Sequence, residues 1–127
     1  MRTVAVVGAS RNSQKFGNKA VRAFLKRGFK VVPINPQCAT MLETVEGLAT
    51  YASVLDAPGE IDIATLYIPP EIGMLLLDEF VQKKIQEIWV NPGADSQALG
   101  LRASTLGLRT IFQCSIVAIG ESPADYA

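Results

Sequence analysis

Short apolar runs alternate with stretches of helical periodicity through most of this sequence. The first run, residues 2–8, is apolar at almost every position, which is typical of a strand covered on both faces in a parallel sheet. Four further runs predict strands at residues 29–35, 61–68, 87–91 and 109–112. We expect the first strand to be the central one. Pro33 lies within the second strand, so we expect that strand to end early or to bend as it leaves the sheet.

The first predicted helix follows the first strand after a short polar stretch. It begins near Phe16 and ends before Gly28, a residue type that commonly follows the last helical residue. Apolar positions at helical spacing predict its buried face: Phe16, Ala20, Val21, Phe24 and Leu25. Basic residues near its end suit the negative end of the helix dipole.

Two later helices follow the third and fourth strands. One begins at a pair of prolines and covers about residues 69–84, since proline is tolerated at the first helical position. Its predicted sheet-facing residues are Ile72, Leu75, Leu76, Phe80 and Val81. The other is capped by Asp95 or Ser96 and ends at Gly107.

The pattern is weakest between the second and third strands. There we expect a short helix at residues 40–45, an extended piece at 50–52 and a turn at 53–59. The tail at residues 114–120 is apolar enough to pack on the core or to form a dimer contact.

Strand and helix alternate five times, which predicts an α/β fold in one domain, residues 1–127. We expect a Rossmann-like, doubly wound parallel five-stranded sheet with helices on both faces. Ligands of such sheets bind at the carboxyl ends of the strands, where the strand order reverses. The residues at the predicted strand ends are Gly8, Ala9, Ser10, Ile34, Asn35, Pro36, Tyr67, Ile68, Pro69, Asn91, Pro92 and Gly93.

The turn after the first strand has the features of an anion site. Backbone N–H groups at the start of a helix lack internal partners and carry positive partial charge. Gly8, Ala9 and Ser10 leave room for a phosphate there. The plainer alternative is that Gly8 only makes a tight turn between strand and helix.

The glycine pattern disfavours a dinucleotide. A dinucleotide fingerprint needs three glycines spaced as G-x-G-x-x-G and an acidic residue after the second strand. In this chain Gly8 is followed by Ala9 and Ser10, and the second strand ends in Asn35.

Composition narrows the classes of function. Lys and Arg number 12 and Asp and Glu number 12, so the formal net charge is zero and no global field favours nucleic acid or an anionic membrane. There is no histidine, the commonest general base. The 2 cysteines suggest neither a metal site nor a disulfide framework. We expect no catalytic residue, no signal peptide and no bilayer-spanning run, and a cytoplasmic location.

Five blocks of sequence carry a family resemblance: V-A-V-V-G-A-S, K-F-G-N-K-A-V, V-V-P-I-N-P, L-Y-I-P-P and E-I-W-V-N-P-G. Together they resemble the small single-domain CoA-binding proteins and, in turn, the CoA-binding amino-terminal domain of the succinyl-CoA synthetase α subunit. The resemblance covers nearly the whole chain. It implies CoA or acyl-CoA as the ligand.

The resemblance also implies where that ligand lies. Phosphate would meet the loop and the helix start at Gly8, Ala9, Ser10, Lys15, Phe16, Gly17 and Asn18. Arg11 or Lys15 would supply positive charge. Ile34, Asn35 and Pro36 would lie along the nucleotide or pantetheine. Beside them would lie Tyr67, Ile68, Pro69, Asn91, Pro92 and Gly93.

The chain departs from this family in two ways. The synthetase has a phosphorylated histidine on a second domain and an ATP-grasp partner, and this sequence contains no histidine, so we expect no ligase reaction from it alone. Many small members carry an arginine after the third strand, where this chain has Ile68-Pro69-Pro70. That substitution removes one expected phosphate contact.

Three functions remain open from the sequence. The first is a CoA or acyl-CoA binding protein without catalysis of its own, with a homo-oligomer as one option. The second is a sensor of NAD(H) or an adenine nucleotide, and the third is the CoA-binding subunit of a split acyl-CoA synthetase with a separate catalytic chain. Cys114 near the mouth of the sheet either forms a mixed disulfide with CoA or, as we favour, is a buried structural thiol.

Overall fold

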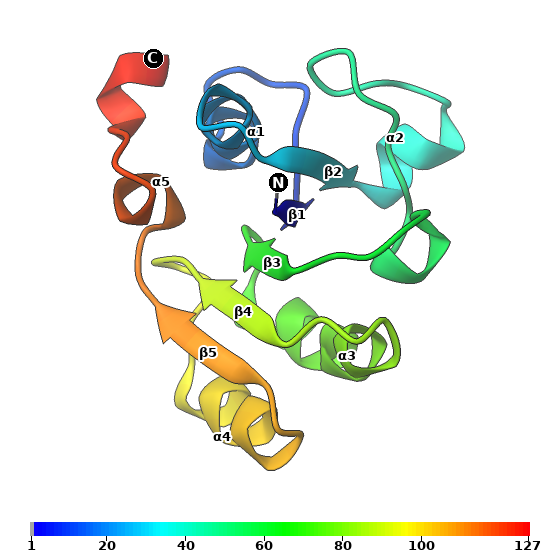
Figure 1. Cartoon of the computed structure of the whole chain (residues 1–127), viewed down its shortest axis with the longest axis vertical. Helices are drawn as coiled ribbons and strands as arrows, with labels where there is room; N and C mark the ends of the chain where they lie inside the picture. Colours follow the sequence, from blue (N-terminus) through cyan, green and yellow to red (C-terminus); the bar gives the residue numbers. More distant parts are fainter. Residues whose placement is uncertain (1) are drawn as a thin grey trace.

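A parallel five-stranded sheet forms the centre of the computed structural model, which describes residues 2–127 (Figure 1). The strands are β1 (Thr3–Val7), β2 (Lys30–Ile34), β3 (Ile63–Leu66), β4 (Glu87–Val90) and β5 (Arg109–Phe112). Their order is β2-β1-β3-β4-β5, and every neighbouring pair is parallel. The predicted doubly wound, Rossmann-like sheet is confirmed. The middle strand is β3, however, and β1 lies second from the edge, so the prediction of a central first strand was wrong.

Helices cover both faces of this sheet, as predicted (Figure 1). One face packs on α1 (Phe16–Lys26) and α5 (Ser115–Ala118), and the other on α3 (Pro70–Gln82) and α4 (Gln97–Thr105). Alternation along the strands divides the core accordingly. Val4 and Val6 of β1 face the α1 layer, and Ala5 and Val7 face the α3 layer.

The buried face of α1 differs from prediction at its two ends. Ala20, Val21 and Phe24 are fully buried, as expected, whereas Phe16 is 55% exposed and Leu25 is 38% exposed. Phe16 is the first residue of the helix and projects beyond the edge of the sheet, at the carboxyl ends of the strands.

Helix α3 turns a different stripe toward the sheet. Its buried residues are Gly73, Leu77 and Phe80, while Ile72, Leu75 and Val81 are exposed. The helix is apolar around most of its circumference, so periodicity alone could not define its rotation. Gly73 lies where α3 packs on α4, and a Cβ there would lie 2.8 Å from Leu99 Cδ1.

Pro33 lies within β2, and the pairing of β2 with β1 continues past it to Ile34. In a parallel strand the N–H and C=O of one residue point to the same side, and the Pro33 carbonyl accepts from the Tyr51 N–H (3.1 Å) at the outer edge. The missing N–H therefore also faces that edge and costs no bond to β1. The expectation that β2 would end early was wrong, because β2 is the edge strand.

The segment after β2 forms its helix earlier than predicted. Helix α2 spans Pro36–Thr40 because Pro36 takes the first helical position and the Asn35 side chain caps it. The expected extended piece is present as a bridge from Tyr51 to Ile34. The expected turn contains a 3-10 helix, η1 (Val54–Asp56).

The last elements agree more closely with prediction. Ser96 caps α4 by accepting from the Leu99 N–H (3.1 Å). The tail packs through Ile116 of α5, which is fully buried, and a second 3-10 helix, η2 (Pro123–Tyr126), follows. No helix within residues 2–127 is long and apolar enough to cross a membrane.

Candidate ligand-binding site

A cavity of about 1110 Å³ opens at the carboxyl ends of the strands. The chain leaves β1 for β2 on one side and returns to β3 on the other, so the strand order reverses between β1 and β3. The cavity lies at this switch point, which is where open α/β sheets bind ligands. Its volume suits a ligand as large as a nucleotide cofactor.

Fifteen of the seventeen residues predicted for the site line this cavity. They are Gly8, Ala9, Ser10, Lys15, Phe16, Gly17, Ile34, Asn35, Pro36, Tyr67, Ile68, Pro69, Asn91, Pro92 and Gly93. The other two, Arg11 and Asn18, do not line it. Arg11 forms an ion pair with Glu43 across the surface. Asn18 is fully buried beneath the loop and donates to the Ser10 carbonyl (2.9 Å) and to Glu46 (3.1 Å).

Two glycines allow the strand and the helix to meet at this cavity. Gly8 has a φ of +95°, and a Cβ on it would lie 2.4 Å from the Tyr67 carbonyl oxygen. Gly17 is in α1, and a Cβ there would lie 2.1 Å from the Gly8 carbonyl oxygen. Gly17 thus provides the close approach of helix to strand that a dinucleotide fold obtains from the last glycine of its motif.

The backbone donors available to a ligand lie at the start of α1 and at Ser10, whose N–H has no acceptor among the described residues, and not at Gly8 or Ala9. Gly8 and Ala9 both donate their N–H to the Ile34 carbonyl (3.1 and 3.2 Å). The N–H groups of Phe16 and Gly17 have no acceptor within residues 2–127. The start of α1 has no side-chain cap and no acidic residue in its first turn. Such a helix start favours an anion.

Lys15 is the cationic side chain at this position. It immediately precedes α1, lines the cavity and is exposed. Among the residues that the structure describes it forms no ion pair, in contrast to Arg11. Positive charge is therefore available beside the free N–H groups of Phe16 and Gly17.

Asn35 occupies the place of the acidic residue of dinucleotide-binding folds. Its Nδ2 donates to the Ala9 carbonyl (2.8 Å), and its Oδ1 accepts from the Cys38 N–H (3.0 Å). The side chain therefore joins the end of β2 to the turn after β1. Its amide oxygen, already engaged in capping α2, lacks the charge with which a carboxylate holds ribose hydroxyls.

The floor of the cavity beneath β3 and β4 is a buried polar network. Asn91 donates to Thr65 Oγ1 (2.9 Å) and to the Leu66 carbonyl (2.8 Å), and accepts from the Ser115 N–H (2.7 Å). The hydroxyls of Thr65 and Ser115 are 2.6 Å apart. Because these groups satisfy one another, the network is structural and fixes the start of α5 against the sheet.

The Tyr67 hydroxyl is the exception in this network. It is buried near the hydroxyls of Thr65 and Ser115, close enough for both to favour its ionised form, but its distances and angles to the described residues fall outside those of a hydrogen bond. Burial, together with the nearby Cys114, holds the pKa of Tyr67 well above its ordinary value of 10.0. Tyr67 is therefore neutral near pH 7 and offers the cavity a ring wall without a charge.

Sequence reasoning missed several cavity residues. Helix α3 contributes Ile72 and Leu76, which the predicted helix rotation had assigned to the sheet contact. Pro123 reaches the cavity from the C-terminal segment, for which the sequence carries no signal. Cys114 was expected near the mouth of the sheet and does line the cavity, but it is only partly buried, so the favoured expectation of a buried thiol was wrong for it; Cys38 is the buried cysteine. Residues 2–127 contain no cluster of three potential metal ligands.

Several known proteins are similar to this chain in sequence or in fold. The chain is 38% identical over 87 residues to an ADP-forming acetate–CoA ligase II of Archaeoglobus fulgidus, a match covering 67% of this chain and 12% of the ligase. It therefore spans about an eighth of that relative's length. It also resembles part of a Ca. Korarchaeum cryptofilum acetyl-coenzyme A synthetase (TM-score 0.73, 28% identity, 87% of this chain and 25% of that one).

Another solved structure matches along its whole length. This is a conserved hypothetical protein of Pyrococcus furiosus, with a TM-score of 0.82 and 31% identity, covering 93% of this chain and 99% of that chain. Residues 2–120 match the family described as the CoA binding domain. The chain accordingly belongs to the family of CoA-binding domains, which it shares with a region of the ADP-forming acetate–CoA ligases.

Proposed function

We propose that this chain binds CoA or acyl-CoA in the cavity, with a phosphate group at the start of α1. The observation that carries the proposal is the pair of N–H groups on Phe16 and Gly17 that have no acceptor in residues 2–127, beside the Lys15 ammonium, which forms no ion pair there. A helix start of this kind, opening into a cavity of nucleotide size, is suited to a pyrophosphate.

The neighbouring surfaces suit the rest of such a ligand. Ile34, Asn35 and Pro36 would lie along the nucleotide or the pantetheine arm, with Tyr67 as a flat wall. Ile72 and Leu76 add an apolar surface from α3 that suits a pantetheine or acyl chain. In this proposal Lys15 supplies the charge, because Arg11 is paired with Glu43.

The proposed role is binding without catalysis, by one domain that comprises residues 1–127. The sequence has no histidine, and the polar side chains in the cavity floor bond to one another. No nucleophile with a base beside it faces the ligand among the described residues. Chemistry on a bound acyl-CoA would therefore come from another protein.

A second candidate is the CoA-binding subunit of a split acyl-CoA synthetase. It is favoured by similarity to the α subunit of an ADP-forming acetate–CoA ligase II of Pyrococcus furiosus, 32% identical over 88 residues and 68% of this chain. Copurification with a separate ATP-grasp protein, and ligase activity of the mixture, would support this role. An NAD(H) sensor has less support, because Asn35 replaces the ribose-binding acid.

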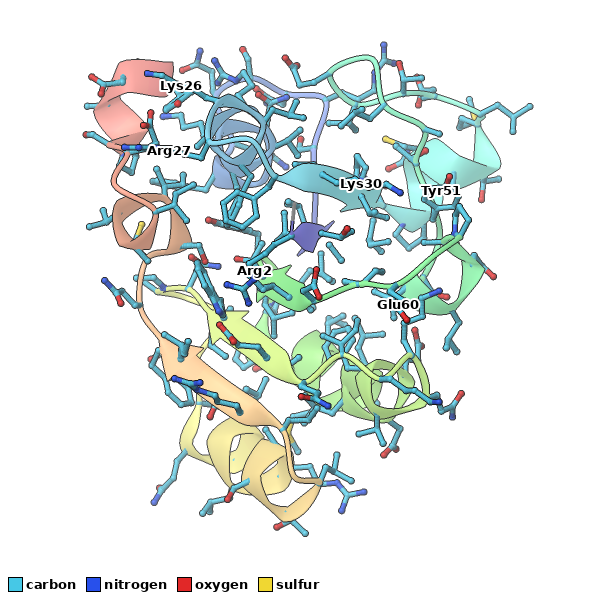
Figure 2. The ribbon with its side chains drawn as sticks, viewed as in Figure 1. Arg2, Lys26, Arg27, Lys30, Tyr51 and Glu60 are labelled. Carbon is cyan, nitrogen blue, oxygen red and sulfur yellow. The ribbon has the colours of Figure 1, made fainter. Side chains whose placement is uncertain are left out.

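Calorimetric titration tests the proposal. We expect CoA and acetyl-CoA to bind more tightly than NAD, NADH, ATP or ADP. Lys15→Met should weaken CoA binding about 5- to 10-fold, since a charge-assisted contact to phosphate is lost. Lys30→Met is the matched control, because Lys30 is an exposed lysine at the opposite end of β2 (Figure 2).

Two results would overturn the proposal. One is no binding of CoA or acetyl-CoA at millimolar concentration, and the other is tighter binding of NADH than of CoA. If Lys15→Met and Lys30→Met weaken CoA binding equally, the phosphate does not bind at the start of α1.

A further inference from the structure

Arg22 joins three parts of the molecule that are distant in sequence. From the middle of α1 its Nη2 donates to the Ser13 carbonyl (2.8 Å) and to the Tyr126 carbonyl (2.7 Å), and its Nε donates to Asn18 Oδ1 (2.8 Å). The guanidinium also lies over the Tyr126 ring, 5.4 Å from its centre. One side chain thus contacts both the loop before α1 and the C-terminal segment, residues 120–127.

The loop at residues 10–15 contacts the rest of the fold through the Arg11–Glu43 ion pair and through the side chains of Asn18 and Arg22. Its internal bonds are short-range, such as Asn12 N–H to Ser10 Oγ (3.0 Å) and Lys15 N–H to the Asn12 carbonyl (3.0 Å). Arg22 holds one end directly at Ser13. It holds the other end through Asn18, whose Nδ2 donates to the Ser10 carbonyl (2.9 Å).

The C-terminal segment is fastened to the same helix by a second arginine. Arg27 donates to the Gly120 carbonyl (2.8 Å) and to Glu121 Oε2 (2.7 Å), and the Tyr126 hydroxyl donates to Glu121 Oε1 (2.6 Å). Figure 2 shows Arg27 and Lys26 beside this segment. The Glu121 side chain is only 6% exposed. Pro123 of the same segment lines the cavity.

We propose that Arg22 is a positioning residue that couples docking of the C-terminal segment to the conformation of the 10–15 loop. When the segment is docked, the Tyr126 carbonyl and ring orient the guanidinium toward Ser13 and Asn18. The loop then leads into α1 with the Phe16 and Gly17 N–H groups facing the cavity. As far as ligand affinity is concerned, this inference rests on the proposed function.

The coupling is reciprocal. If docking of the segment tightens the site, a ligand at the start of α1 must stabilise docking by the same factor. A preordered loop also binds with less loss of conformational entropy than a mobile one.

Three arginine-to-methionine variants separate this coupling from a general structural effect. Arg22→Met removes the link itself, and Arg27→Met loosens the segment without touching the loop. Arg102→Met is the control, since Arg102 lies on the surface of α4 with one 3.7 Å pair to Asp78. Hydrogen exchange is measured at the Asn12, Gln14 and Lys15 amides without ligand, and the Kd for CoA is measured by calorimetry.

We expect loop exchange about tenfold faster in Arg22→Met and about threefold faster in Arg27→Met, with CoA binding weaker by similar factors. Arg102→Met should match the wild type in both measurements. Bound CoA should slow exchange at the Asp125 amide in the wild type and less so in Arg22→Met.

The coupling would be overturned if Arg27→Met speeds hydrogen exchange at the Asp125 amide of the segment but leaves exchange at the Asn12, Gln14 and Lys15 amides unchanged. That test needs neither ligand binding nor a folded Arg22→Met protein. If the wild type fails to bind CoA, the proposed function fails, while the exchange comparison still decides whether the segment positions the loop.

Discussion

Gly17 shows how one missing methyl group lets the site form. A Cβ at this position would overlap the Gly8 carbonyl oxygen, at 2.1 Å, and that oxygen belongs to backbone that cannot move aside cheaply. We expect Gly17→Ala to lower the free energy of unfolding by about 2–3 kcal/mol, as overpacking does. Chemical denaturation measures the change.

Gly100→Ala provides the comparison for Gly17→Ala. Both glycines are helical with ordinary φ, but the added Cβ at Gly100 would meet the tip of the exposed Phe112 ring at 3.1 Å. The ring can turn away, so the change should stay within about 1 kcal/mol of the wild type. Equal losses in the two variants would contradict the argument from close approach.

We expect the buried hydroxyl of Tyr67 to lower the stability of the fold. Its hydroxyl is buried without a hydrogen-bond partner among the described residues, so Tyr67→Phe should leave the free energy of unfolding unchanged or raise it by up to about 1 kcal/mol.

The raised pKa of Tyr67 also makes the stability of the protein depend on pH. Ionisation is easier in the unfolded chain, so wild-type stability should fall above pH 10. Denaturation curves for Tyr67→Phe should lack that part of the fall; a clear loss of stability near pH 7 would show that the hydroxyl has a partner.

At the scale of elements, Asn91 connects β3, β4 and α5. Asn91→Ala would leave the buried Ser115 N–H without its acceptor and remove the donor to Thr65 and Leu66. We expect a loss of about 2–4 kcal/mol of unfolding free energy. Gln113→Ala, at an exposed position just after β5, should change stability little, and a similarly small effect of Asn91→Ala would refute the role assigned to the network.

Docking of the C-terminal segment should weaken at acid pH. The Tyr126 hydroxyl, followed by Lys26 and Arg27, holds the pKa of Glu121 below its ordinary value of 4.5. A lowered pKa means that the carboxylate stabilises docking above about pH 4.5, and that this contribution is lost as the pH falls further. Exchange at the Asp125 amide should therefore accelerate in acid in the wild type and less in Glu121→Gln. Identical pH profiles would show that Glu121 does not hold the segment.

Element-level prediction succeeded where a local signal was strong and failed where packing decides. The bounds of β5 and the Ser96 cap follow from turn and capping residues that can be read directly from the sequence. The rotation of α3 does not, because Ile72 and Leu77 are equally apolar and only packing against the sheet and α4 buries Leu77. The prediction that the second strand ends early at Pro33 was wrong because the sequence does not say which strand lies at the edge of the sheet.

For the whole molecule, the position of the cavity could be predicted because parallel strands end together. Fifteen predicted residues meet there from four separate turns. Which of these residues have charges or N–H groups free for a ligand could not be predicted. Pairing of Arg11 with Glu43, and the use of the Gly8 and Ala9 N–H groups by Ile34, depend on contacts between segments far apart in the chain.

The position of the bound phosphate can be tested by titrating the isotopically labelled protein with CoA and following its backbone amide resonances. If a phosphate binds at the start of α1, the largest shifts should appear at Phe16 and Gly17, with smaller ones at Gly8 and Ala9. Saturable shifts centred on Phe16 and Gly17 are the predicted result. Saturable shifts that leave these two amides unchanged would show that no phosphate binds at the start of α1.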